Sequence, residues 1–259
     1  MPRQSLLHHA VHARPIFADG LHVAKDENDS LRADLLSTPA VREGISSVPS
    51  GLSENVEQQG FAIIPEVLTH DEVARLAEDF AQLAIRRSRA GVRHVLGHPA
   101  VEKLAREARL LGMAQTILGS EAFPFRATLF DKSSVANWLV VWHQDTALPV
   151  RERRETTGWG PWSIKDGIVY SHAPESALRR VLALRVHLDD STADNGPLRV
   201  LPGSQTKGLL TDNEVHELAA KATPVDCLVP QGGVLAMRPL LVHSSSKVAR
   251  AGCQAGVAH

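Results

Sequence analysis

The segment Trp138–Asp145 ends in a histidine and an aspartate that lie two residues apart. The apolar residues before His143 indicate a β-strand, and residues i and i+2 of a strand face the same side. His143 and Asp145 would therefore present an imidazole and a carboxylate together. With a second histidine from a distant strand they would form a 2-His-1-carboxylate set, which suits Fe(II) and leaves positions open for a co-substrate and O₂.

A His-x-Asp pair is a weak motif on its own. The chain has 13 histidines among 259 residues, and chance alone predicts roughly one such pair. Two are present, His143–Asp145 and His187–Asp189. His143 follows an apolar run and precedes Thr-Ala-Leu-Pro, which places it at a strand end, where the ligand sites of barrels tend to lie. His187 falls inside the apolar run Val181–Leu188 and is interpreted as a polar-face residue of that strand.

The third ligand is expected on a late strand. The run Val234–Val242 is strongly apolar and is followed directly by His243. A lone histidine after an apolar strand is usually a boundary residue, so the assignment of His243 depends on its pairing with the other two side chains. We predict an iron site made of His143, Asp145 and His243.

Two helices are predicted ahead of the strands. Thr69 and Glu72 form a capping box before an apolar face at helical spacing, and a second helix is expected from Pro99 to about Leu118. From Phe125 onward, short apolar runs alternate with turn residues, which is typical of a sandwich or barrel. This order predicts an α+β fold, mainly β, in which N-terminal helices brace a β-barrel.

The chain is long enough for one large hydrophobic core. Residues 1–55 lack sustained periodicity and are expected to form a loosely ordered extension, with residues 56–259 as a single domain. The net charge of −1 gives no argument for binding nucleic acid or an anionic membrane. No apolar run reaches the roughly 18 residues that span a bilayer, and Cys227 and Cys253 are too few for a disulfide framework. A cytoplasmic protein without a signal peptide is expected.

Beyond the candidate ligands, the chain carries a series of short blocks between Gly60 and Lys247. The blocks are Phe130-Asp-Lys132, Asn137-Trp138, Trp142-His-Gln-Asp145, Gly158-Trp-Gly-Pro-Trp162, Leu188-Asp-Asp190, Asn195–Ser204 and Met237–Ser245. In this order they resemble the phytanoyl-CoA dioxygenase family, particularly its bacterial members. Several ordered blocks are far more specific than one motif.

The resemblance implies a double-stranded β-helix core, which is a jelly roll of the cupin-like kind. It implies Fe(II) and 2-oxoglutarate, with decarboxylation of 2-oxoglutarate to succinate and CO₂ while O₂ hydroxylates a small-molecule substrate. By position, His143, Asp145 and His243 match the family's iron ligands. Related halogenases have a small residue in place of the carboxylate, so Asp145 favours hydroxylation.

The resemblance also implies residues that bind 2-oxoglutarate. Ser245 matches a residue that contacts the co-substrate, and Thr128 and Arg185 fall where the family has pocket residues. Arg185 is equally well interpreted as an ordinary charge on a barrel strand. The family usually has an arginine about ten residues after the distal histidine, whose fork would pair with the C5 carboxylate. Here Arg250 is the only arginine after His243, in a segment rich in alanine and glycine that makes a poor strand.

Three functions follow from these observations. The first is a hydroxylase in which Arg250 binds the C5 carboxylate from a shifted loop. The second is a catalytically impaired relative that binds metal but lacks a complete 2-oxoglutarate site. The third, a cupin-like metalloenzyme such as an isomerase, fits least because no further histidine or glutamate ligand lies near His143. The segment Pro149–Pro174 is predicted to be a lid loop or a solvated surface loop, and no basic cluster near the predicted mouth calls for the phosphates of coenzyme A.

Overall fold

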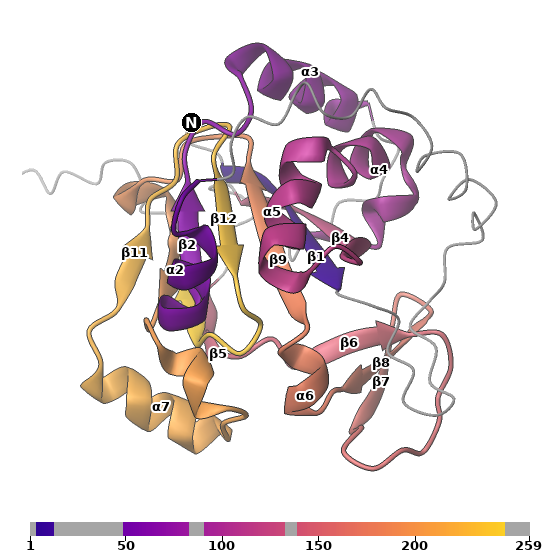
Figure 1. Cartoon of the computed structure of the whole chain (residues 1–259), viewed down its shortest axis with the longest axis vertical. Coiled ribbons are helices and arrows are strands. Elements are labelled where there is room, and N and C mark those ends of the chain that lie inside the picture. The colour runs from indigo at the N-terminus through magenta and orange to yellow at the C-terminus, as the bar shows by residue number, and fades with distance from the viewer. Residues whose placement is uncertain (1–3, 13–48, 83–90, 133–138, 247–259) are drawn as a thin grey trace, which may run out of the picture.

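The computed structural model describes residues 4–12, 49–82, 91–132 and 139–246 of the chain (Figure 1). Its centre is a six-stranded antiparallel sheet. In spatial order, the strands are β2 (Phe61–Ile64), β12 (Val234–Met237), β9 (Val181–His187), β1 (Gln4–His12), β4 (Phe123–Lys132) and β3 (Val92–Arg93). No helix within the described residues is long and apolar enough to cross a membrane.

A four-stranded antiparallel sheet forms the second layer of the barrel. Its strands, in order, are β11 (Val225–Cys227), β10 (Leu198–Val200), β13 (His243–Ser245) and β5 (Val140–His143). Leu235 and Met237 of the large sheet share one buried core with Leu198 and Val200 of the small sheet. Two antiparallel sheets that pack face to face over such a core confirm the predicted jelly roll.

Four helices, α2 (Leu52–Gln59), α3 (His70–Ala81), α4 (Pro99–Ala105) and α5 (Ala108–Leu118), cover the outer face of the large sheet (Figure 1). Helix α7 (Asp212–Lys221) instead packs near β5, and α6 (Glu175–Leu178) lies between β8 and β9 in the chain. The 3₁₀ turns are η3 (Val95–Gly97), η4 (Ala193–Asn195) and η5 (Ser204–Lys207). Leu182, Leu184 and Val186 of β9 pack in one cluster with Val56 of α2 and Leu110 of α5. Since side chains alternate along a strand, the residues between them face the barrel interior.

The predicted helix starts are confirmed with one correction. Thr69 caps α3, because its hydroxyl accepts from the Glu72 amide at 3.3 Å while its own amide donates to the Glu72 carboxylate at 2.7 Å. The helix predicted from Pro99 to about Leu118 is instead two helices. Its break is at Glu107, whose carboxylate accepts hydrogen bonds from the amides of Arg109 and Leu110 and so begins a new helix.

The N-terminal segment differs from the loose extension that was predicted. Gln4–His12 forms β1, which pairs antiparallel with β4 along its whole length and with β9 from Leu6 to His12. The strand was missed because its sequence has no clean alternation, so its strand form depends on the two neighbours that hydrogen-bond to it. Residues 13–48 lie outside the described part of the chain.

A third sheet follows the end of β5. It contains β6 (Ala147–Val150), β8 (Ile168–His172) and β7 (Trp162–Lys165), in that order. The segment Pro149–Pro174, which was predicted to be a lid or surface loop, therefore contains the strands of this sheet as well as the loop that joins β6 to β7. Leu148 and Val150 pack with Leu178 and Val181, which attaches this sheet to the beginning of β9.

Candidate metal centre

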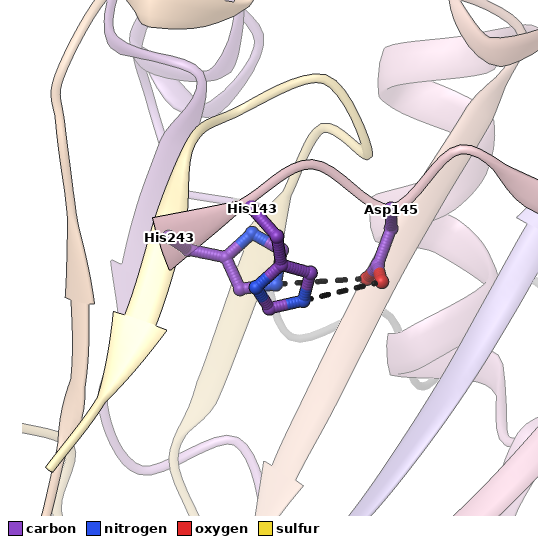
Figure 2. A group of neighbouring side chains, drawn as sticks. All are labelled: His143, Asp145 and His243. Carbon is purple, nitrogen blue, oxygen red and sulfur yellow. Dashed lines mark ion pairs between the residues drawn. The ribbon is translucent and has the colours of Figure 1, made fainter. Parts of the chain in front are cut away.

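The two candidate histidine ligands lie directly opposite each other on neighbouring strands. His243 begins β13 and pairs with His143 at the end of β5, and their ring centroids are 4.2 Å apart. Asp145 follows β5 two residues after His143, and its carboxylate faces both rings (Figure 2). Antiparallel pairing thus brings the distant His243 to the predicted His-x-Asp pair.

Both imidazoles turn the same nitrogen toward the carboxylate. Nε2 of His143 lies 3.8 Å from Oδ1 of Asp145, and Nε2 of His243 lies 3.7 Å from Oδ2 (Figure 2). One ligand atom from each residue falls within 4.8 Å of the others. Within the described ranges, this is the one group of three or more histidine, cysteine or acidic side chains with such spacing.

The other ring nitrogen of each histidine fixes the tautomer. Nδ1 of His143 lies 2.8 Å from the Val141 carbonyl, and Nδ1 of His243 lies 2.8 Å from the Leu241 carbonyl. A carbonyl oxygen only accepts a hydrogen bond, so Nδ1 is the donating nitrogen in both rings. Both Nε2 lone pairs are then free to bind a cation beside the carboxylate, which is the arrangement that a metal site needs.

The centre has a buried side and an open side. His243 is only 4% exposed, and burial lowers its pKa to about 4, against the opposing effect of the Asp145 charge. The ring is therefore neutral at pH 7 and able to act as a ligand. The side chains of His143 and Asp145 are 35% and 41% exposed, so small molecules can approach from their side. Two imidazoles and one carboxylate with an open side suit Fe(II).

Gln144, between the two ligands of β5, anchors this strand end. Its amide nitrogen donates to the carbonyls of Gly208 at 2.9 Å and Leu240 at 2.7 Å, and its amide oxygen accepts from the Leu210 amide at 2.9 Å. The Asp145 amide also donates to the Pro239 carbonyl at 2.9 Å. The supporting role of Gln144 was not predicted from the sequence. The one indication was its position between His143 and Asp145, which places its side chain on the opposite side of the strand from the two ligands.

The described residues predicted to bind 2-oxoglutarate lie on three strands around the interior. Ser245 is on β13, two residues after His243. Thr128 of β4 is buried, and it occupies the same register position as Arg185 of β9, since both pair with His8 of β1. Arg250 lies outside the described residues.

Arg185 is a cation in the barrel interior. Its Nε is buried without a hydrogen-bond partner among the described residues. Burial lowers the pKa of its guanidinium, and the Asp145 carboxylate acts in the opposite direction. The guanidinium carbon lies 5.8 Å from the ring centroid of Phe130. Arg185 is therefore a largely buried cation near the metal ligands.

The alternative pair at His187 does not form a comparable site. His187 lies on the same side of β9 as Arg185, but this side is covered and the ring is only 2% exposed. Neither ring nitrogen has a hydrogen-bond partner among the described residues. Burial, aided by the charge of Arg185, lowers the pKa of His187 to about 3. His187 is thus a neutral buried histidine.

The third sheet is tied directly to the metal-binding strand. The Ala173 amide donates to the Thr146 carbonyl at 2.9 Å, and the Thr146 hydroxyl lies 2.7 Å from Nδ1 of His172. The third sheet also contributes to a group of basic side chains. Arg93, Arg126 and Lys165, which are far apart in sequence, gather on the side where this sheet meets β3 and β4.

Comparisons with known proteins agree with this geometry. The chain is 26% identical to L-proline trans-4-hydroxylase of Streptomyces griseoviridis, over 73% of this chain and 77% of the relative. It is 22% identical to the ectoine dioxygenase of Stutzerimonas stutzeri (strain A1501), over 87% of this chain and 81% of that enzyme.

A solved structure and a family model also match. EctD from S. alaskensis, solved with 2-oxoglutarate and 5-hydroxyectoine, superposes with a TM-score of 0.56 at 19% identity, covering 92% of this chain and 78% of EctD. That likeness concerns the fold. The family model for phytanoyl-CoA dioxygenase (PhyH) matches residues 56–250, which is most of the sequence. The chain therefore belongs to the phytanoyl-CoA dioxygenase family.

Proposed function

We propose that this chain is an Fe(II)- and 2-oxoglutarate-dependent dioxygenase that hydroxylates a small-molecule substrate and releases succinate and CO₂. The observation that carries the proposal is the cluster of His143, Asp145 and His243, with ligand atoms within 4.8 Å. Two imidazoles and a carboxylate are the ligand set of non-haem iron oxygenases and leave positions open for a co-substrate and O₂. The family membership and the relatives named as a hydroxylase and a dioxygenase support the reaction class.

The three side chains have distinct roles in this proposal. Nε2 of His143, Nε2 of His243 and the Asp145 carboxylate would hold the iron, which supplies the O₂ activation needed to oxidise a C–H bond. The backbone carbonyls at Nδ1 hold both rings in the tautomer that binds metal. Gln144 fixes the strand end and so orients His143 and Asp145, while the exposed sides of these two residues face the incoming molecules.

For 2-oxoglutarate we propose contacts from Thr128, Ser245 and Arg185. A buried guanidinium without a carboxylate partner is costly, so an anion that reaches Arg185 would be bound tightly. The C5 carboxylate of 2-oxoglutarate is such an anion, and the position of Arg185 near the charge of Asp145 supports this assignment. Arg250 is the alternative partner for the same carboxylate.

Turnover tests the reaction class. The full chain with Fe(II), 2-oxoglutarate and O₂ is expected to form succinate, and Asp145→Ala is expected to abolish this because it removes the only charged ligand. Iron binding without any succinate, with or without candidate substrates, would instead indicate the catalytically impaired relative. We also propose a cytoplasmic location, because a reducing compartment keeps iron as Fe(II) and agrees with the free thiol of Cys227.

The co-substrate contact is tested by affinity. Arg185→Met is expected to weaken 2-oxoglutarate binding by about 10- to 100-fold, the range for losing a charge-assisted hydrogen bond. Arg106→Met is the matched control, since Arg106 forms an exposed pair with Glu102 of α4. An unchanged affinity in Arg185→Met would assign the C5 carboxylate to another residue, with Arg250 the first to be substituted.

A further inference from the structure

Basic side chains from three elements meet around the phenol of Tyr170. Tyr170 of β8 is 2% exposed, and its hydroxyl lies 3.3 Å from Nε2 of His94, which follows β3. Arg126 of β4 lies near enough to the same phenol for its charge to oppose the rise in the pKa of Tyr170 that burial causes. Nζ of Lys165 in β7 lies 4.9 Å from the centroid of the phenol ring. We call Arg93, Arg126 and Lys165, together with this phenol, the basic cluster.

The basic cluster has more cations than carboxylates within the described residues. Arg93 faces Asp166 at 3.6 Å, in a pair that is largely open to solvent. Arg126 has a buried Nε without a hydrogen-bond partner in the described ranges. Burial lowers the pKa of Lys165, and the neighbouring charges of Arg93 and Arg126 lower it further. Three cations beside two carboxylates, Asp166 and the more distant Asp145, leave an excess of positive charge, and an anion placed among them would relieve the repulsion between the cations.

The basic cluster lies beside the metal centre. The carboxylate of Asp145 is close enough to raise the pKa of Lys165 against the effect of burial. The strand β6 starts two residues after Asp145, and β8 is tied to Thr146 through His172. Arg126 also lies two residues before Thr128, on the same side of β4. An anion held by Arg126 and Lys165 would therefore be close to the open side of the iron site.

We propose that the basic cluster binds a carboxylate of the primary substrate, so that the enzyme oxidises a small carboxylic or amino acid. Arg126 and Lys165 are the binding pair, since Arg93 already faces Asp166. A carboxylate fixed by a guanidinium and an ammonium would set the distance between the substrate's C–H bonds and the iron. This inference rests on the proposed function and adds the substrate class. The C5 carboxylate of 2-oxoglutarate is a different group, and we assign its binding to Arg185.

Binding measurements test the substrate class. The full chain is loaded anaerobically with Fe(II) and 2-oxoglutarate, and a panel of free amino acids and small hydroxy acids is compared with the matching primary amides by calorimetry. Binding is expected to be confined to acids, with each amide at least about tenfold weaker. Lys165→Met and Arg126→Gln are expected to weaken acid binding by about 10- to 100-fold. Lys221→Met, which removes an exposed lysine paired with Glu217 on α7, should change nothing.

The affinity for 2-oxoglutarate is measured in the same preparations and separates the two carboxylates. It should stay within about twofold of wild type in Lys165→Met. A loss of 2-oxoglutarate affinity with acid binding intact would assign the cluster to the co-substrate and overturn the proposal. Equal binding of acids and amides, wild-type binding by Lys165→Met, or no binding by any acid would also overturn it. If Arg126→Gln fails to fold, Lys165→Met alone still tests whether the basic cluster binds the substrate carboxylate.

Discussion

His187 is a buried histidine whose replacement should make the protein more resistant to acid. Its pKa is lowered to about 3 by burial and by the charge of Arg185, and both ring nitrogens lack partners among the described residues. In the unfolded chain the same ring titrates near the usual value of about 6.5. The unfolded state therefore binds more protons below that pH, and the free energy of unfolding falls as the pH drops from about 6.5 toward 3.

The size of this effect follows from the two pKa values. At pH 7.5 the ring is neutral in both states and contributes almost nothing to the pH dependence. At pH 5 the unfolded ring is protonated and the folded ring is not, which costs about 2 kcal/mol. His187→Leu removes this cost and also removes two unpaired nitrogen atoms, so it should raise the free energy of unfolding at pH 7.5 by about 1 to 2 kcal/mol.

Urea unfolding of the metal-free protein at pH 7.5 and pH 5 measures both effects. His243 has a lowered pKa as well and adds to the acid sensitivity of wild type, so the comparison is the difference between wild type and His187→Leu. The variant should lose about 2 kcal/mol less between the two pH values. An equal loss in both proteins would refute the assignment of His187 as a buried, neutral and unpaired ring.

Three further predictions concern the supports of the site. Gln144→Ala should weaken Fe(II) binding by about 10- to 100-fold, because three hydrogen bonds that orient His143 and Asp145 are lost. A titration with Fe(II) measures the affinity, and an affinity equal to that of wild type would contradict the prediction. Deleting residues 1–12 should lower the melting temperature strongly, because β4 and β9 both lose their partner strand. Thermal unfolding followed by circular dichroism measures the melting temperature, and an unchanged value would count against the prediction. Arg109→Met should destabilise the protein by about 2 kcal/mol at pH 7 and by less below pH 4.5. The reason is that the Arg109 hydrogen bond holds the pKa of Glu72 at about 2, and this stabilisation is lost when Glu72 is protonated. Urea unfolding at pH 7 and pH 3 gives both values, and an equal loss of stability at the two would refute the prediction.

The β-barrel with N-terminal helices and the His143–Asp145 pair could be predicted from local patterns in the sequence, whereas the jelly-roll core was implied by the resemblance to the family. Alternation along a strand brings His143 and Asp145 to one side, and an apolar run ending at His243 indicates a late strand. The structure adds that β5 and β13 are neighbours, with the two histidines opposite each other.

Other features depend on contacts between distant segments. The partners of Gln144 lie 64, 66 and 96 residues away in sequence, so its role could not be read from its neighbours. The strand β1 is stabilised by β4 and β9 rather than by its own pattern. Likewise, Arg93, Arg126 and Lys165 become a cluster only when the third sheet meets the large one.

The most direct test of the iron site is an anaerobic titration of the full chain with Fe(II) and 2-oxoglutarate, followed by visible absorption. The chelated co-substrate should give a metal-to-ligand charge-transfer band in wild type. His143→Ala and His243→Ala should lose this band, and His187→Leu, which replaces the histidine of the other His-x-Asp pair, should keep it. No band with wild type, or a band that survives His143→Ala, would contradict the assignment of iron to His143, Asp145 and His243.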